Sequence, residues 1–417
     1  MERWTHEEFC ELYRVMGEPT QEAFAEWLDV GSRSVQRWLT EPDKRPSAAV
    51  SHRLDGRLRQ AARERLRWVP ADQVQQMHRR DLLTLLSTAA ATPLGGMSLP
   101  WSGGHPRISA ASLSSLEEIT TVLAGKYSTS PPYTLLGSAM GHLEEVSGLL
   151  KTATMGPSER ERLESVVADV AIFVGALSMA SGKLAQADAH LGLAEKMAKQ
   201  AGSMALLAQV FAEQALLQYY AQPPAEANDD PRDRVALLEQ AQTLAARYAP
   251  AIVQMAINGW LAEDMAAVPD ARGADEALDR CGRAFQKAQT EGPVGTGFCS
   301  SVGRYGGWGE GRLEGFRGTV EVSLRRPGAV RTFETSLRLK SDLRGRANGL
   351  ADLATALITT HKQPEEPCAR IAEAHTVGVS QGSAVIRHHV LRARLLMPPK
   401  WNSLRCVREL DERLGTR

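Results

Sequence analysis

Residues 20–38 constrain the fold more strongly than any other segment, because their pattern predicts two short helices joined by a tight turn. In the first helix, apolar side chains recur at helical spacing, at Ala23, Phe24, Trp27 and Leu28. Val30 and Gly31 form the turn, where glycine relieves the backbone, and the Ser32 hydroxyl can cap the second helix. The segment therefore has the layout of a helix-turn-helix unit.

The second helix has an apolar inner face and a polar outer face. Val35, Trp38 and Leu39 fall on the inner face. The outer face carries Ser32, Arg33, Ser34, Gln36 and Arg37. Arginine can donate two hydrogen bonds to guanine and glutamine can pair with adenine in the major groove, so we expect these five side chains to contact DNA bases. A solvated helix face beside a core is the alternative, but the spacing of the whole segment favours DNA binding.

Positive charge begins at this second helix. The whole chain is balanced, with 49 Lys and Arg against 49 Asp and Glu. Residues 1–30 hold two arginines and eight acids, a difference of −6, whereas residues 31–70 hold ten basic residues and four acids, a difference of +6. Because phosphate contacts need such a local positive surface, we expect Lys44, Arg45 and Arg53 to contact DNA phosphates.

Further residues within and after these two helices match a known pattern. Gln21 opens the first helix, Ala25 lies at the predicted helix crossing, and Val30, Val35 and Trp38 are apolar in the turn and the second helix. Arg45-Pro46-Ser47, Val50 and Leu54 begin a further helix. In these features residues 5–68 resemble the phage-repressor type of helix-turn-helix protein, the Xre family, although Leu39–Pro42 departs from the Glu and Gly frequent there. The resemblance implies a DNA-binding domain of about five helices at residues 1–68, with Gln21 on the DNA backbone.

Residues 69–108 are predicted to be a linker with a docking helix. Glycine and proline are dense between Gly95 and Pro106, and the apolar run Thr84–Ala91 precedes them. His78-Arg79-Arg80 before this run resembles a twin-arginine export sequence, but it lies internally and the run is too short to span a bilayer. Five scattered cysteines without a CxxC pair favour reduced thiols. We therefore expect a cytoplasmic, nucleoid-associated protein that does not enter a membrane.

Residues 109–417 show helical periodicity with a weak internal repeat. Aromatic residues make up 6% of the chain, and alanine and leucine are abundant, which favours packed helices over sheets. Small residues recur seven apart in the second helices of successive predicted hairpins, as Ala187 and Ala194, Ala277 and Ala284, and Ala329 and Ser336. Two other hairpins fit this pattern only in part, because a large residue takes one of the two small-residue positions. His375 lies seven residues after Cys368, and Arg234 lies seven residues before Ala241. Chance pairing in alanine-rich helices is the alternative.

Small residues at such crossings resemble those of tetratricopeptide repeats. We expect four to six repeats, which are elongated or degenerate compared with the usual unit of ~34 residues. Looser motifs are Tyr127 with Pro131–Leu136, Trp308 before Arg312–Gly318, and Glu409–Leu414. With them, the chain resembles actinobacterial regulators that join an Xre-type domain to a tetratricopeptide-like sensor. The resemblance implies an all-α chain, with an α-solenoid at residues 109–417 whose concave face binds a small molecule or peptide and alters DNA binding.

Aromatic residues provide a candidate ligand pocket in the repeats. Trp308, Tyr305 and Trp260 are the candidates, because glycines around Trp308 can open space. Tyr219 and Tyr220 could line the same groove. Aromatic residues at helical spacing are more often part of a core, which is the alternative.

Catalytic and cofactor motifs are missing from the sequence. Gly306–Gly311 lacks dinucleotide-binding spacing because Glu314 stands where glycine is required. The adjacent His388 and His389 point about 100° apart on a helix and have no Cys, His or Asp cluster beside them. We therefore expect neither an enzyme nor a cofactor or metal.

The sequence thus predicts a transcriptional regulator that binds specific sequences in double-stranded DNA and whose repeats sense a ligand or dimerise. A homodimer would contact two half-sites ~34 Å apart. The alternative is a tetratricopeptide-type interaction scaffold without specific DNA binding.

Overall fold

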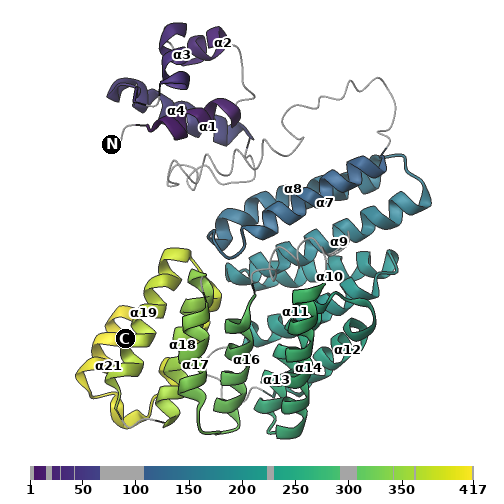
Figure 1. The fold of residues 1–417 in the computed structure, drawn as a ribbon, viewed down its shortest axis with the longest axis vertical. Helices are drawn as coiled ribbons and strands as arrows, with labels where there is room; N and C mark the ends of the chain where they lie inside the picture. The colour runs from purple at the N-terminus through teal and green to yellow at the C-terminus, as the bar shows by residue number, and fades with distance from the viewer. Residues whose placement is uncertain are drawn as a thin grey trace. The chain divides into compact units, whose positions relative to one another are not determined.

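The computed structural model describes residues 4–15, 21–28, 30–41, 43–65, 108–222, 230–291, 308–340, 342–360 and 363–415. Within these ranges the chain is all-α, as predicted, with eighteen α-helices and a short 3₁₀ turn, Pro399–Trp401 (Figure 1). The chain divides into two compact units, Met1–Gly104 and His105–Arg417. The division falls within the predicted linker, although residues 66–107, with the proposed docking helix, lie outside the described residues.

The first unit holds four described helices around a small apolar core. They are α1 (His6–Val15), α2 (Gln21–Leu28), α3 (Ser32–Thr40) and α4 (Ala48–Arg65). Phe9 of α1 packs edge-on against Phe24 of α2 and Trp38 of α3, with ring centroids 5.8 and 5.4 Å apart. Val35 and Leu54 are fully buried in the same core. These aromatic contacts fix the position of α3, so that only its other side can face outward.

The turn between α2 and α3 differs from the predicted one. α3 begins at Ser32, so this serine is not the cap; Gly31 takes the N-cap position without a side-chain hydrogen bond. The φ of Gly31 is −75°, which any residue adopts, and therefore glycine is not required there. Backbone bonds form the turn instead, since Val30 donates to the Ala25 carbonyl at 3.0 Å and Ser34 donates to Gly31 at 2.9 Å. The predicted cap and the predicted role of Gly31 were both wrong.

The second unit starts with two helices, α7 (Ala110–Gly125) and α8 (Pro132–Thr152), followed by helical hairpins in chain order (Figure 1). The first two hairpins are α9 (Pro157–Ala180) with α10 (Leu184–Gln200), and α11 (Met204–Ala221) with α12 (Arg232–Tyr248). The next are α13 (Ala251–Ala267) with α14 (Ala271–Thr290), and α16 (Glu310–Ser323) with α17 (Ala329–Leu339). The last is α18 (Leu343–Thr360) with α19 (Glu365–Gln381), on which α20 (Ala384–Leu395) and α21 (Arg405–Leu414) pack. This sequential packing agrees with helical repeats.

The small residues predicted at hairpin crossings lie where the helices approach closely. All six are buried, namely Ala187, Ala194, Ala277, Ala284, Ala329 and Ser336. The Ser336 hydroxyl donates to the Gly311 carbonyl of the preceding helix at 2.6 Å. Arg234, which breaks the pattern, is also buried and pairs with Asp264 at 2.7 Å. His375 is half-buried beside the fully buried Ala374.

The first helices of the hairpins form an inner layer that closes on itself. α9, α11, α13, α16, α18 and α20 each contact the next in this order, and α20 contacts α9. At the closing point, the position of a Cβ on Gly182 lies 3.2 Å from the Ala384 Cβ. The predicted solenoid with a concave face is thus a ring of six inner helices.

Helix α9 of this inner layer is long and strongly apolar. By length and composition it could cross a membrane, but 94% of its most apolar stretch is buried inside the fold. Its composition is therefore explained by its contacts with α8, α10, α11 and α20.

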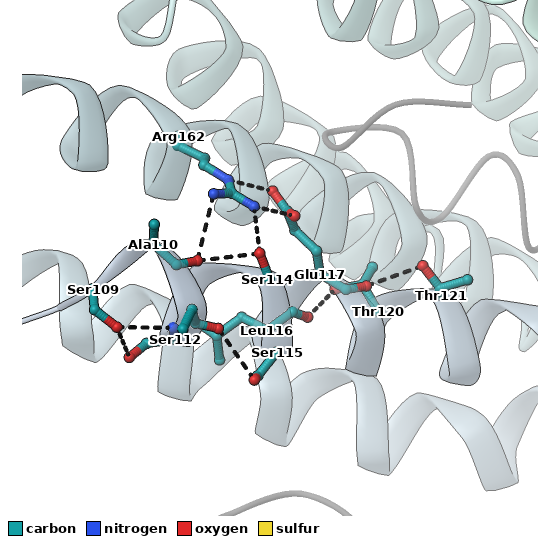
Figure 2. A network of polar contacts seen from close by, with 11 residues as sticks. Ser109, Ala110, Ser112, Ser114, Ser115, Leu116, Glu117, Thr120, Thr121 and Arg162 are labelled. Atoms are coloured by element: carbon teal, nitrogen blue, oxygen red, sulfur yellow. Dashed lines mark hydrogen bonds and ion pairs between the residues drawn. The ribbon is translucent and has the colours of Figure 1, made fainter. Parts of the chain in front are cut away.

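A polar network fastens α7 to α9 (Figure 2). Arg162 of α9 donates to both carboxylate oxygens of Glu117, at 2.9 and 2.7 Å, and to the Ser114 hydroxyl at 2.9 Å. Ser109 caps α7 by accepting from the Ser112 backbone N–H at 3.1 Å. The Glu117 side chain is only 6% exposed, so its charge depends on Arg162 for compensation.

We predict that Arg162→Leu lowers the free energy of unfolding by about 3 kcal/mol, because it leaves a buried carboxylate without its cation. Urea unfolding of the full chain measures this. Arg272→Leu is the matched control, since the Arg272 and Glu276 side chains are 91% and 54% exposed and their pair should contribute about 0–1 kcal/mol. Equal losses of stability in the two variants would contradict the prediction.

Candidate functional site

The outer face of α3 carries the five residues that the sequence assigned to DNA bases. Arg33, Gln36 and Arg37 are exposed, whereas Ser32 and Ser34 are half-buried. Arg37 Nε lies 3.5 Å from Glu41 Oε2, and both side chains are at least half exposed. Such an exposed pair is weak, so it leaves Arg37 available for other partners.

The residues assigned to phosphates lie before and after α3 in the sequence. Lys44, Arg45 and Arg53 are exposed, and Gln21 is half-buried at the first position of α2. These positions give donors at a helix start, at a loop and along α4. Contact with DNA stays a prediction for all nine residues.

The ring of inner helices surrounds a chamber with two lobes, of about 360 and 320 Å³. Volumes of this size are typical of small-molecule sites. Every inner helix contributes to the first lobe, through Met179, Tyr220, Trp260, Arg312, Asn348 and Ile386. Leu216, Tyr220, Trp260, Arg312 and Asn348 also line the second lobe, so they form the wall that the lobes share.

Aromatic rings line the first lobe. Trp260 and Trp308 meet edge to face with centroids 6.0 Å apart, and Trp308 meets Phe316 in the same way at 6.1 Å. The Arg312 guanidinium carbon lies 4.6 Å from the ring centroids of both Trp308 and Phe316. Two of the predicted pocket residues, Trp260 and Trp308, therefore line a cavity, while Tyr305 lies outside the described residues. That they contact a ligand stays a prediction.

The second lobe contains the contacts between α20 and α11. Arg392 donates to the Tyr219 hydroxyl at 2.6 Å, and the Tyr220 hydroxyl lies 3.3 Å from His389 Nε2. The other nitrogen of His389 lies 3.1 Å from Asp352 of α18. We refer to these five residues as the latch. Burial raises the pKa of Tyr219 to about 12, so its hydroxyl stays protonated.

Acidic groups in the second lobe differ in charge. Burial works against the ionised form of Asp352, but the hydrogen bond and charge of His389 hold its pKa below the usual range. Burial raises the pKa of Glu263 to about 8, against the opposing effect of Arg312. At neutral pH, Asp352 is therefore ionised and Glu263 is largely protonated.

Sequence reasoning missed the polar members of the chamber, namely Glu263, Arg312, Lys340, Asn348 and Asp352. A usable signal was present, because Glu263 and Asp352 interrupt the apolar runs of α13 and α18. A carboxylate within a buried helix requires a partner or a changed pKa, so it marks a candidate site. Within the described ranges, no group of three or more His, Cys, Asp or Glu could hold a metal ion.

No protein-family model matches the chain, and no curated protein matches it. Among solved structures, the chain is similar to a signal transduction ATPase with numerous domains (STAND) protein with a tetratricopeptide repeat sensor from Pyrococcus horikoshii. Identity is 13% and the TM-score is 0.30, over 93% of this chain and 57% of the other chain. The present chain thus spans little more than half the length of that protein.

We predict that Glu263→Gln changes the pH dependence of stability. In the folded protein Glu263 keeps its proton up to about pH 8, whereas the unfolded chain loses it near 4.5, so this group lowers the free energy of unfolding as pH rises through that window. The glutamine variant should therefore gain stability relative to the original protein between pH 5 and 8, by about 1–3 kcal/mol. Urea unfolding at both pH values measures the difference. Glu239→Gln, at an exposed position, is the control, and an equal pH response in both variants would refute the assignment.

Proposed function

We propose that this protein is a sequence-specific DNA-binding transcriptional regulator whose repeat unit binds a small effector molecule. The observation that carries the first part is the two-sided packing of α3. Val35 is fully buried while Arg33, Gln36 and Arg37 are exposed, on a short helix that follows α2 after three residues. This is the arrangement that a helix-turn-helix protein uses in the major groove.

In this proposal each group of residues has a separate role. Arg33 and Arg37 can each donate two hydrogen bonds to a base edge, Gln36 can donate one and accept one, and the two serines of α3 add single hydrogen bonds. Gln21, Lys44, Arg45 and Arg53 contact phosphates and fix the position of the helix without distinguishing sequences. A homodimer would place two such helices on half-sites ~34 Å apart.

The chamber supports the second part of the proposal. Six helices contribute to its wall, so a molecule bound there would contact most of the repeat unit at once. A ligand that binds one state of the ring more tightly shifts the population toward that state. The effector would act on DNA binding through such a shift.

We predict that Arg33→Ala weakens specific DNA binding by about 1–3 kcal/mol and relaxes the preference at one base position. The experiment selects DNA from a random pool with the purified full chain and with the Arg33→Ala/Arg37→Ala variant, and compares the enriched sites. Arg272→Ala/Arg405→Ala is the matched control, since both arginines are exposed and pair four residues onward, as Arg37 does.

An enriched site that the α3 variant loses and the control variant keeps would support the proposal. The proposal would be refuted if no site were enriched, or if the Arg33→Ala/Arg37→Ala variant enriched the same site as the original protein. The interaction scaffold would then be the better account, because helical repeats often provide extended protein-binding surfaces.

We predict a different response for the phosphate residues. Lys44→Ala/Arg45→Ala should weaken binding to all DNA sequences alike, because phosphates carry no sequence information. The slope of log K against log salt should fall by about 0.9 for each phosphate that the variant no longer neutralises. Fluorescence anisotropy with specific and random duplexes at several salt concentrations measures both effects. A changed site preference with an unchanged slope would contradict the assignment.

A further inference from the structure

Two cations in the wall of the first lobe form no salt bridge among the described residues, although the charge of Asp352 acts on both. The first is Lys340, which follows α17 and is 9% exposed. Its ammonium lies between glycines of two other helices, 3.3 Å from the positions that a Cβ would take on Gly315 and on Gly349. Glycine on both sides provides room for a buried ammonium that larger residues would crowd.

The second cation is Arg312, in the wall shared by both lobes. Its guanidinium carbon lies 4.6 Å from the ring centroids of both Trp308 and Phe316, which meet edge to face beside it. Within the described part of the chain its Nε is buried and makes no hydrogen bond. The positive charge of Arg312 also disfavours a proton on Lys340, whose pKa burial and Arg312 together lower to about 8.

Several other charged side chains around the chamber are paired, and Arg344, a third cation of the first lobe, lies over the Tyr127 ring. Arg234 is paired with Asp264, Asp352 with His389, and Arg392 donates to Tyr219. Glu263, which faces Arg312, is largely protonated at neutral pH and does not neutralise it. Burying a cation without an anion is costly, so the arrangement favours the arrival of an anion.

Whereas the two cations favour an anion, Asn348 favours a hydrogen-bond donor on the bound molecule. Its Oδ1 lies in the shared wall, buried and without a hydrogen-bond partner within the described ranges. A bound molecule that fits this wall would present a donor, such as a hydroxyl or an amide N–H, to this oxygen.

We propose that the first lobe binds a small molecule with an oxyanion, a carboxylate or a phosphate, held between Arg312 and Lys340, and with a flat apolar body against Trp260 and Trp308. This inference rests on the effector-binding half of the proposed function and names the chemical class of the effector. The lobe volume of about 360 Å³ accommodates a body of two fused rings with one polar group.

The test uses four compounds with one naphthyl body and different head groups. 2-Naphthoate and 2-naphthyl phosphate carry the two oxyanions, 2-naphthamide is neutral, and 2-naphthylmethylamine is a cation. Calorimetric titration of the full chain measures each affinity. We expect one of the anions to bind at least about tenfold more tightly than the amide and the amine, since charge-assisted hydrogen bonds are the stronger ones. The preferred anion identifies the oxyanion class.

The variant Lys340→Met keeps the apolar stem and removes the charge. It should lose the anion preference by about tenfold or more, without losing stability in urea, because a buried charge is removed. Lys196→Met is the matched control, since Lys196 is an exposed lysine of α10 outside the chamber. Inorganic phosphate gives a test independent of the naphthyl body, and it should raise the melting temperature of the original protein but not of Lys340→Met.

Equal affinity for anion, amide and amine would overturn the proposal, and so would an anion preference that survives in Lys340→Met. Failure to bind any of the four compounds, without stabilisation by phosphate, would also overturn it. These results are independent of DNA selection with the α3 variants. If no specific DNA site is found, the anion site can still be confirmed by calorimetry. If the anion site is refuted, specific DNA binding can still be confirmed by selection.

Discussion

The repeat unit depends on the contact that closes its inner layer. α20 packs against α9, and it reaches α11 across 169 to 173 residues of sequence through the hydrogen bonds of His389 to Tyr220 and of Arg392 to Tyr219. His389 also reaches Asp352 of α18, so the latch connects three inner helices. Without this contact the inner faces of six helices would line an open groove. With it, they form the wall of one chamber, and the buried charges of that wall become neighbours.

Close helix approach at glycines provides the room around the two cations of the chamber. A Cβ on Gly259 of α13 would lie within 2.5 Å of the Phe316 ring of α16, so only glycine admits this ring. Phe316 in turn stacks on the Arg312 guanidinium, and the room beside Lys340 also comes from glycines. Glycines at close approaches of the inner helices therefore help to set the positions of both cations, Gly259 through Phe316 and Gly315 and Gly349 beside Lys340.

The features that could be predicted from the sequence are those that depend on the residues of one helix or one hairpin. Helical periodicity and the buried pairs such as Ala187 and Ala194 depend on side-chain size along one helix, so they were accessible. The Ser32 cap was wrong because serine preference cannot distinguish the cap from the first helical residue next to it. The closure and the cation pair were missed because their members come from distant helices with no local signature. The α3 face could be proposed from sequence because one helix carries it.

A chamber built by all inner helices has a consequence for signalling. A molecule held between Arg312 of α16 and Lys340, against Trp260 of α13, would touch helices next to latch helices α11 and α18, in a wall that it shares with Tyr220 of the latch. It would stabilise the closed arrangement only if its contacts require all these helices in place, since equal affinity for closed and open rings shifts nothing. The latch consists of hydrogen bonds to tyrosine and histidine rather than of a large apolar contact. Its strength is therefore comparable to the free energy that a small ligand can supply, which is the condition for a ligand to control the ring.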